Sequence, residues 1–261
     1  MLYTIETITE CIGARRVGTH EATIDWLLTD SRSLSFPEET LFFALTTKRN
    51  KGARYIPELY ERGVRNFVVT QEEFNELTVD NGQLTIAMQH AGSAATVNCQ
   101  LSTVNFLIVG NPLKALQKLA ELHRERFQIP VIGITGSNGK TIVKEWLHQL
   151  LSPDRVIVRS PRSYNSQIGV PLSVWQMNEE AELAIFEAGI SEMGEMRALQ
   201  NMIKPTIGIL TNIGGAHQEN FFSLQEKCME KLSLFKNCDV VIYNADNELI
   251  SNCVKIGRAH V

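Results

Sequence analysis

The sequence lacks the features that mark membrane-spanning and disulfide-stabilised proteins. Within its 261 residues no apolar run approaches the ~20 residues that a membrane-spanning helix needs. Residues 1–10 carry neither a basic leader nor an apolar stretch, so we expect no membrane span and a cytoplasmic protein. The five cysteines are scattered and never spaced as Cys-x-x-Cys, which predicts reduced, half-buried thiols instead of disulfides or a zinc site.

An excess of positive charge is also missing. Lysine and arginine number 25 against 29 aspartates and glutamates, which leaves a net charge of -4. Because nucleic-acid binding depends on basic residues that release counterions, we predict no nucleic-acid partner. The 44% hydrophobic and 21% charged composition excludes disordered and fibrous classes. The length indicates two domains, or one domain and part of another.

Short apolar runs alternate with helix-length segments along the chain. Runs of this length predict buried strands, and the intervening segments predict helices. We therefore expect an α/β protein made of βα units with a mostly parallel sheet. The predicted strands are 41–45, 67–69, 84–88, 106–109, 131–135, 183–186, 207–210 and 240–243.

A domain boundary is predicted near residue 110. Asn111-Pro112 is typical of a helix start, and residues 113–127 carry apolar side chains at helical spacing. Pro130 then breaks the chain just before the next strand. The predicted domains are 1–110 and 111–255.

The strongest chemical signal is a glycine loop between the strand 131–135 and an amphipathic helix that extends to residue 151. The loop reads Thr-Gly-Ser-Asn-Gly-Lys-Thr over residues 135–141. Backbone N–H groups of such a loop bind phosphate oxygens, while Lys140 adds charge and Thr141 offers a hydroxyl to Mg²⁺. A nucleoside triphosphate is the predicted ligand. Ile134 stands where the stricter motif has glycine, and the alternative is a glycine turn that merely starts a helix.

At residues 135–141 the sequence resembles the Mur ligase family, the ATP-dependent amide-forming enzymes of peptidoglycan precursor synthesis. Further segments resemble the family in the same order along the chain, over about residues 25 to 250. They are the uridine-nucleotide segments 29–32 and 41–45, the substrate loop 165–171, the acidic metal position 186–189, the histidine segment 211–217, and the segment 230–235, which carries a carbamylated lysine in several members. The resemblance implies a small N-terminal α/β uridine-nucleotide domain followed by an ATP-binding domain.

Within the family, residues 168–172 and 194–199 resemble the branch that adds D-alanyl-D-alanine to UDP-N-acetylmuramoyl-tripeptide. The N-terminal third resembles the Bacteroidetes-type version, in which the ligase is fused to an alanine racemase. Pyridoxal phosphate would belong only to that racemase part, which this sequence does not contain. Ser163 and Ser166 depart from the family pattern, because the substrate loop usually carries asparagines there.

The resemblance implies that ATP converts a substrate carboxylate into an acyl phosphate, which the incoming amine attacks. The implied ATP-binding residues are Gly136, Ser137, Asn138, Gly139, Lys140, Thr141 and Asn212. The implied UDP-substrate residues are Ser31, Arg32 and Asn165. The implied Mg²⁺ ligands are Thr141, Glu187, His217 and carbamylated Lys231, and the implied catalytic residues are Lys140, Glu187, His217 and Lys231. A nitrogen ligand such as His217 is less usual for Mg²⁺ than oxygen.

Four of these residues have ordinary structural alternatives. Glu187 could be the solvated end of a strand, and His217 a residue of a turn. Lys231 has charged neighbours along its predicted helix, which is typical of a solvated face. Arg32 could form a surface salt bridge.

Two other functions stay open. The chain could be a nucleotide-binding module without complete chemistry, or another ligase of the Mur or folylpolyglutamate type; the latter does not explain Asp30-Ser31-Arg32 in a preceding domain. Only 18 residues follow Tyr243, whereas members of the family continue into a third domain. We therefore expect an incomplete ATP-binding domain that cannot finish ligation, and a foreign tail over residues 256–261.

Overall fold

A computed structural model describes residues 2–47, 51–76, 78–80, 83–90, 93–215 and 220–258. The chain divides into two compact units, Met1–Leu119 and Ala120–Val261. The division falls inside helix α4 (Pro112–Arg124), which begins at the predicted helix start Asn111-Pro112. The domains 1–110 and 111–255 stay a prediction. None of the helices in the described ranges combines the length and apolar character that crossing a bilayer requires.

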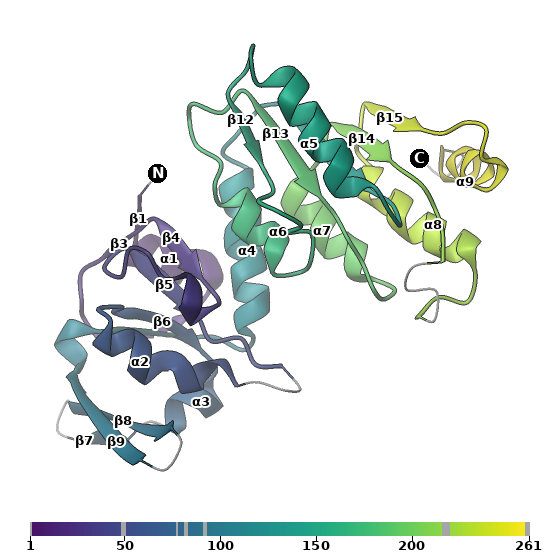
Figure 1. The fold of residues 1–261 in the computed structure, drawn as a ribbon. Coiled ribbons are helices and arrows are strands. Elements are labelled where there is room, and N and C mark those ends of the chain that lie inside the picture. The colour runs from purple at the N-terminus through teal and green to yellow at the C-terminus, as the bar shows by residue number, and fades with distance from the viewer. Residues whose placement is uncertain are drawn as a thin grey trace. The chain divides into compact units, whose positions relative to one another are not determined.

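The first unit contains a five-stranded mixed sheet of order β2-β10-β6-β5-β4, of which β4, β5 and β6 are labelled in Figure 1. Its neighbours pair in parallel except β2, which runs antiparallel to β10. The strands of this sheet are β2 (Arg15–Val17), β4 (Trp26–Leu28), β5 (Thr40–Phe43), β6 (Asn66–Val69) and β10 (Asn105–Ile108). The unit also contains β1 (Tyr3–Thr4), β3 (Thr23–Ile24), helices α1 (Ile5–Ile12), α2 (Ile56–Glu61) and α3 (Gln71–Asn75), and 3₁₀ turns η1 (Ser31–Ser33), η2 (Gly52–Tyr55) and η3 (Leu101–Thr103).

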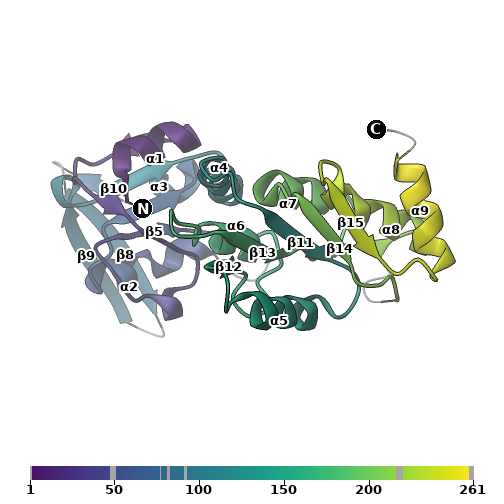
Figure 2. The same ribbon diagram turned by 90° about the horizontal axis from the view of Figure 1, so that it is seen from above.

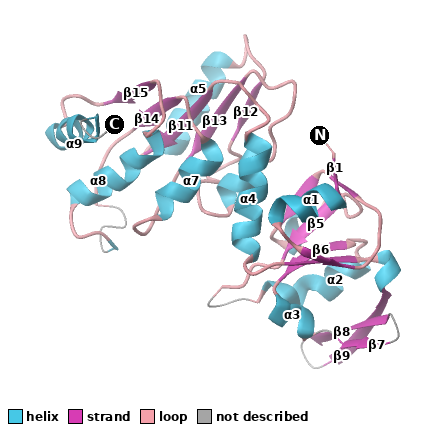
Figure 3. Ribbon diagram, turned by 180° about the vertical axis from the view of Figure 1, so that it is seen from behind, coloured by secondary structure: helices cyan, strands magenta, loops and turns pink. Residues whose placement is uncertain are grey.

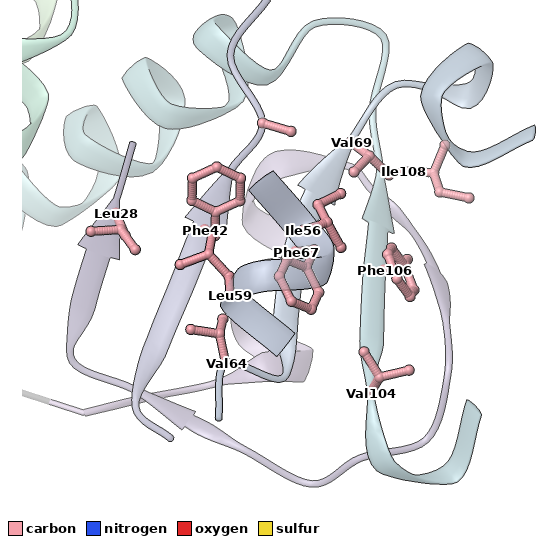
Figure 4. Packing of buried hydrophobic residues seen from close by; sticks show 11 residues of the cluster. Leu28, Phe42, Ile56, Leu59, Val64, Phe67, Val69, Val104, Phe106 and Ile108 are labelled. Atoms are coloured by element: carbon pink, nitrogen blue, oxygen red, sulfur yellow. The ribbon is translucent and has the colours of Figure 1, made fainter. Parts of the chain in front are cut away.

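The core of this unit is a row of aromatic rings on neighbouring strands, shown in Figure 4. The ring of Phe67 stacks on that of Phe106 with centroids 5.5 Å apart, and it meets Phe42 edge-on. Ile56 and Leu59 of α2 belong to the same cluster. Every residue of β5, β6 and β10 is buried, so both faces of these strands are covered. Continuous apolar runs mark such strands, which is why their prediction is confirmed.

Three strands of the first unit form a separate antiparallel sheet (Figure 3). They are β7 (Thr78–Asp80), β8 (Gln83–His90) and β9 (Ser93–Gln100). The predicted strand 84–88 is therefore present, but its assignment to a βα unit is wrong. Only two residues separate each strand from the next, and a parallel crossover needs about a dozen. The Asn-Gly dipeptide at 81–82 is a hairpin signal that the period-based prediction overlooked.

The second unit is built on a five-stranded sheet of order β12-β13-β11-β14-β15, in which every pairing is parallel. The strands are β11 (Val131–Thr135), β12 (Ile157–Arg159), β13 (Leu183–Glu187), β14 (Ile207–Leu210) and β15 (Val240–Tyr243). Four of the five were predicted, and β12 was missed because only two of its three residues, Ile157 and Val158, are apolar. The helices are α5 (Lys140–Leu151), α6 (Gly169–Val174), α7 (Glu195–Ile203), α8 (Leu224–Leu232) and α9 (Glu248–Arg258), with the 3₁₀ turn η5 (Ser233–Phe235).

Helices cover both faces of this sheet, with α5 on one face and α7 on the other (Figures 1 and 2). Val143 and Leu147 of α5 pack against a cluster that includes Ile134 and Ile185 of the central strands. Residues 256–258 of the predicted foreign tail continue α9, and residues 259–261 lie outside the described residues.

Candidate nucleotide and metal site

The predicted phosphate loop lies at the carboxyl edge of the parallel sheet. Residues 136–139 follow β11, Glu187 ends the neighbouring strand β13, and Thr211 follows β14 on the other side. Because the carboxyl ends of parallel strands meet at one edge, three segments far apart in the sequence converge there. Strand order thus brings these three segments to one site.

The backbone conformation of the loop requires glycine at both positions. Gly136 has φ +143°, and a Cβ at this position would come within 2.0 Å of Thr211 Oγ1. Gly139 has φ +82° and immediately precedes α5. Residues with side chains rarely adopt such angles. Ile134, which breaks the stricter motif, is buried within β11, so the loop begins after it.

The segment after β14 holds the phosphate loop in place. The Ser137 amide donates to Asn212 O (2.9 Å), and the Asn138 amide donates to Asn212 Oδ1 (2.9 Å). Ser137 Oγ donates to Gly214 O (3.2 Å) and accepts from the Gly214 amide (2.9 Å). Asn212 was predicted to bind ATP. In this structure its backbone and its side chain both support the loop.

Lys140 lies over the loop that precedes it. Its Nζ donates to Gly136 O at 2.8 Å, and the side chain is half-buried. Burial lowers the pKa of Lys140; Glu187 opposes that shift, and the positive charge of Lys227 adds to it. The ammonium is therefore held beside the backbone N–H groups that would receive phosphate oxygens.

Thr141 and Glu187 form the arrangement that a metal would need. Thr141 Oγ1 donates to Glu187 Oε2 (3.0 Å) and lies 3.2 Å from Ser163 Oγ, and Asn165 Nδ2 also donates to Glu187 Oε2 (3.2 Å). Glu187 is fully buried, so the alternative of a solvated strand end is wrong. Hydroxyl and carboxylate oxygens are the hard donors that Mg²⁺ prefers, so the residues present fit that ion.

The second oxygen of Glu187 has a different partner, which the sequence analysis missed. Glu187 Oε1 lies 2.9 Å from Nζ of Lys144, an ion pair in which both side chains are fully buried. Oε1 makes no hydrogen bond of acceptable geometry among the described residues. Lys144 lies at helical spacing from the partly buried Leu147 and Leu151 of α5, and a lysine on an apolar stripe is the signal that could have identified it.

Two lysines of α8 complete a group of cations near the loop. Lys227 and Lys231 are 1% and 3% exposed, so the solvated-face alternative for Lys231 is wrong. Lys227 Nζ donates to Gly214 O at 2.6 Å. Burial, together with the charges of Lys140 and Lys227, lowers the pKa of Lys231 to about 8. A substantial fraction of the Lys231 amine is therefore neutral in mildly alkaline solution.

The orientation of α8 is fixed by the residue before Lys231. Glu230 Oε1 accepts hydrogen bonds from the amides of Gly194 (2.9 Å) and Met196 (3.0 Å) at the start of α7. A carboxylate there binds the free N–H groups of the helix terminus. Because this contact holds Glu230 against α7, the adjacent Lys231 is turned into the protein.

The predicted metal ligand His217 lies outside the described residues, so its pairing with Lys231 stays a prediction. Among the residues that are described, no group of three or more histidine, cysteine, aspartate or glutamate side chains could hold a metal ion. A metal at this edge would depend on Thr141, Glu187 and oxygens of the nucleotide, as Mg²⁺ commonly does.

The predicted UDP-substrate residues lie in two places. Arg32 of the first unit directs its guanidinium at Asp30, with Nε 2.9 Å from Oδ1 and Nη2 2.6 Å from Oδ2, and its side chain is 87% exposed. The hydrogen bond from Arg32 lowers the pKa of Asp30. Ser31 is buried, and its carbonyl accepts from Arg62 Nη1 (2.8 Å). Asn165 belongs to the second unit, beside Glu187.

The fold and this edge define a P-loop α/β protein with a parallel central sheet. Residues 134–260 match the family model of the Mur ligase middle domain, and the chain belongs to the Mur ligase family. The UDP-N-acetylmuramoyl-tripeptide–D-alanyl-D-alanine ligase of Borreliella burgdorferi is 32% identical over 234 residues, which cover 87% of this chain and 46% of that protein.

Two solved structures share the fold. Crystal structure II of MurF from Acinetobacter baumannii has a TM-score of 0.79 at 20% identity and covers 99% of this chain and 52% of that one. MurF ligase from Thermotoga maritima in complex with ADP has a TM-score of 0.68 at 23% identity and covers 88% of this chain and 48% of that one. The predicted α/β fold class is confirmed. The chain spans about half the length of the relatives it matches.

Proposed function

We propose that this chain carries the UDP-substrate and ATP-binding portions of a ligase that adds D-alanyl-D-alanine to UDP-N-acetylmuramoyl-tripeptide in peptidoglycan synthesis. The observation that carries the proposal is the arrangement at the sheet edge, where Lys140 covers the glycine loop and Thr141 Oγ1 lies 3.0 Å from Glu187 Oε2. A cytoplasmic location follows from the use of ATP and a UDP-linked precursor.

Bound ATP would supply the γ-phosphoryl group that converts the substrate carboxylate into an acyl phosphate, with ADP as the leaving group, and Mg²⁺ would neutralise phosphate charge. The amine of D-alanyl-D-alanine would then displace inorganic phosphate to form the amide. Phosphoryl transfer requires mainly positioning and neutralisation of phosphate charge. Lys140 supplies a positive charge at the loop, and the N–H groups that begin α5 supply a cradle. Thr141 and Glu187 would hold the Mg²⁺. These residues need no rearrangement of the strands to act together, because the sheet already juxtaposes them.

Lys231 would be carbamylated and would help to hold a second Mg²⁺ together with His217. The lowered pKa of Lys231 supports this proposal, because only a neutral amine reacts with CO₂. A carbamate would also place negative charge among Lys140 and Lys227, whose charges repel a protonated Lys231. We therefore assign Lys227, together with Lys140 and Lys231, to the proposed site.

In the first unit, Arg32 would bind the diphosphate of the UDP-substrate with its forked donors, assisted by Ser31. Its exposure leaves it accessible to such a ligand. Asn165 would orient the muramoyl-peptide end, since it lies beside Glu187. Fusion to an alanine racemase in the complete protein stays a prediction.

The extent of the structural similarity favours this proposal over a ligase of the folylpolyglutamate type. The A. baumannii MurF fold covers 99% of the chain and so includes the first unit. A nucleotide-binding module without complete chemistry is the remaining alternative, and the experiment below distinguishes it.

The test is isothermal titration of the 261-residue chain with ATP and with UDP-N-acetylmuramoyl-tripeptide, beside an assay of phosphate release after D-alanyl-D-alanine is added. Binding of both ligands, with ATP binding strengthened by Mg²⁺, is the expected result. Because the chain spans about half the length of its relatives, the phosphate-release assay uses a version extended to their full length. Binding without phosphate release in that version would favour the module. Absence of nucleotide binding would contradict the proposed function.

A further inference from the structure

Lys144 is a buried cation to which the proposed phosphate chemistry assigns no part. Its side chain is fully buried, whereas Lys140, one helical turn earlier, is half-buried beside the loop. Besides its ion pairs with Glu187 and with the partly exposed Glu145 (3.1 Å), Lys144 Nζ donates to Ser160 O (2.8 Å) and to Arg162 O. One ammonium therefore joins α5, the end of β13 and the loop after β12.

The two carboxylate oxygens of Glu187 serve different neighbours. Oε1 lies 2.9 Å from Lys144 Nζ, and Oε2 accepts from Thr141 Oγ1 and from Asn165 Nδ2. A carboxylate is planar, so an anchor on Oε1 also fixes the direction of Oε2. The contact with Lys144 thus directs Oε2 towards the hydroxyl of Thr141.

The same ammonium holds the loop after β12. Arg162 has φ +49°, a left-handed conformation that costs free energy for a residue with a side chain. Lys144 binds the carbonyls of Ser160 and Arg162, and the next residue, Ser163, then lies with its Oγ 3.2 Å from Thr141 Oγ1. Lys144 therefore stabilises the strained turn that brings Ser163 to the site.

We propose that Lys144 is a positioning residue for metal–nucleotide binding: it orients Glu187 towards Thr141 and holds residues 160–163 at the site without touching the nucleotide. The inference rests on the proposed function only in taking Thr141 and Glu187 as metal ligands. The positive charge of Lys144 by itself would weaken Mg²⁺ binding, since a nearby ammonium repels a metal cation, whereas the positioning role strengthens it. The sign of the effect of a Lys144 substitution therefore separates positioning from simple charge.

The experiment measures the affinity of the 261-residue chain for ADP by titration calorimetry, with and without Mg²⁺. In Lys144→Met, metal-free ADP binding stays at the parent level, because Lys140 and the glycine loop are intact. The gain in affinity that Mg²⁺ gives to the parent falls by roughly 10- to 100-fold, as is typical when the partner of a metal ligand is removed. An unchanged or larger Mg²⁺-dependent gain would overturn the inference.

Arg124→Met is the matched control. Arg124 is another buried cation of the second unit, and it binds the carbonyls of Ile203 (2.9 Å) and Lys204 (3.2 Å) at the end of α7. Its loss should lower stability and leave the Mg²⁺-dependent gain unchanged. A merely structural role of Lys144 would make the two variants behave alike.

Two further measurements cover the case in which Lys144→Met does not fold. Lys144→Gln keeps a donor for one carbonyl and should show the same loss of Mg²⁺ dependence. A crystal structure of the parent with ADP and Mg²⁺ should keep Lys144 on Glu187 Oε1 while Oε2 faces the metal; a Glu187 turned away from Lys144 would refute the inference.

A parent that binds no ADP, or binds it without a Mg²⁺ effect, would overturn the proposed function as well, whereas a Lys144 variant with normal Mg²⁺ dependence overturns this inference alone.

Discussion

The two units differ in how they hold the charged side chains that we assign to ligands. In the second unit Lys144 and Glu187 are fully buried and Lys231 is 3% exposed, whereas Arg32 of the first unit is 87% exposed and paired with Asp30. Burial of a charge is costly unless the charge is paired, so the second unit fixes the geometry of its site as it folds. Arg32, by contrast, would have to exchange Asp30 for a ligand.

Lys140→Ala should have the largest effect and should separate binding from folding most clearly. The substitution removes a positive charge that would bind phosphate, from a half-buried side chain that donates a hydrogen bond to Gly136 O of its own loop. We expect ATP-dependent activity of the complete ligase to be abolished and the thermal unfolding midpoint to change little. The checks are ATP titration and thermal unfolding of the same sample. Normal nucleotide affinity and turnover in the variant would refute the assignment.

Gly136→Ala should damage both stability and nucleotide binding. The added Cβ would come within 2.0 Å of Thr211 Oγ1 at a φ of +143°. Gly13→Ala in the first unit is the control, because Gly13 has φ +63° but no atom within 4 Å of the added Cβ. The control should lose about 1 to 2 kcal/mol of unfolding free energy from the left-handed backbone alone. Denaturant unfolding should show a larger loss for Gly136→Ala, and an equal loss would contradict the clash.

Lys231 should make stability depend on pH. Its pKa is about 8 in the folded chain against an ordinary value of 10.5, so the unfolded state binds more protons between these values. Lys231 should therefore contribute stability that increases as the pH rises from about 8 towards 10.5 in a CO₂-depleted sample. Burial raises the pKa values of Cys228 and Cys238 to about 12, and these thiols contribute in the opposite direction. The check is therefore the difference in unfolding free energy between the parent and Lys231→Met, which should grow with pH in this interval; a constant difference would show that burial does not lower the pKa of Lys231.

The sequence predicts the parts of the fold and of the site that depend on patterns among residues close together in the sequence. The buried strands around residues 131–135 and 183–186 and the glycine loop have such patterns, because parallel strands covered on both faces are continuously apolar. The ion pair of Lys144 with Glu187 joins residues 43 positions apart, and no local pattern specifies it. The burial of Lys231 likewise depends on Glu230 contacting α7, which the charges along α8 do not reveal.

Arg32→Ala should have the smallest effect, and it should lower the affinity for the UDP-substrate only. Arg32 lies in the first unit and is largely exposed, so its removal should leave stability and ATP affinity unchanged. The loss of one charge-assisted hydrogen bond to the UDP-substrate should cost roughly 1.5 to 3 kcal/mol of binding free energy. Part of that cost is offset, because Arg32 must first release Asp30.

Arg15→Ala is the control and should bind the UDP-substrate normally. Arg15 is another exposed arginine of the unit, and its guanidinium donates to Gln71 Oε1 (2.8 Å). Titration of both variants with UDP-N-acetylmuramoyl-tripeptide decides the matter: equal affinities would mean that the Asp30–Arg32 pair is a surface salt bridge and that the uridine nucleotide is bound elsewhere.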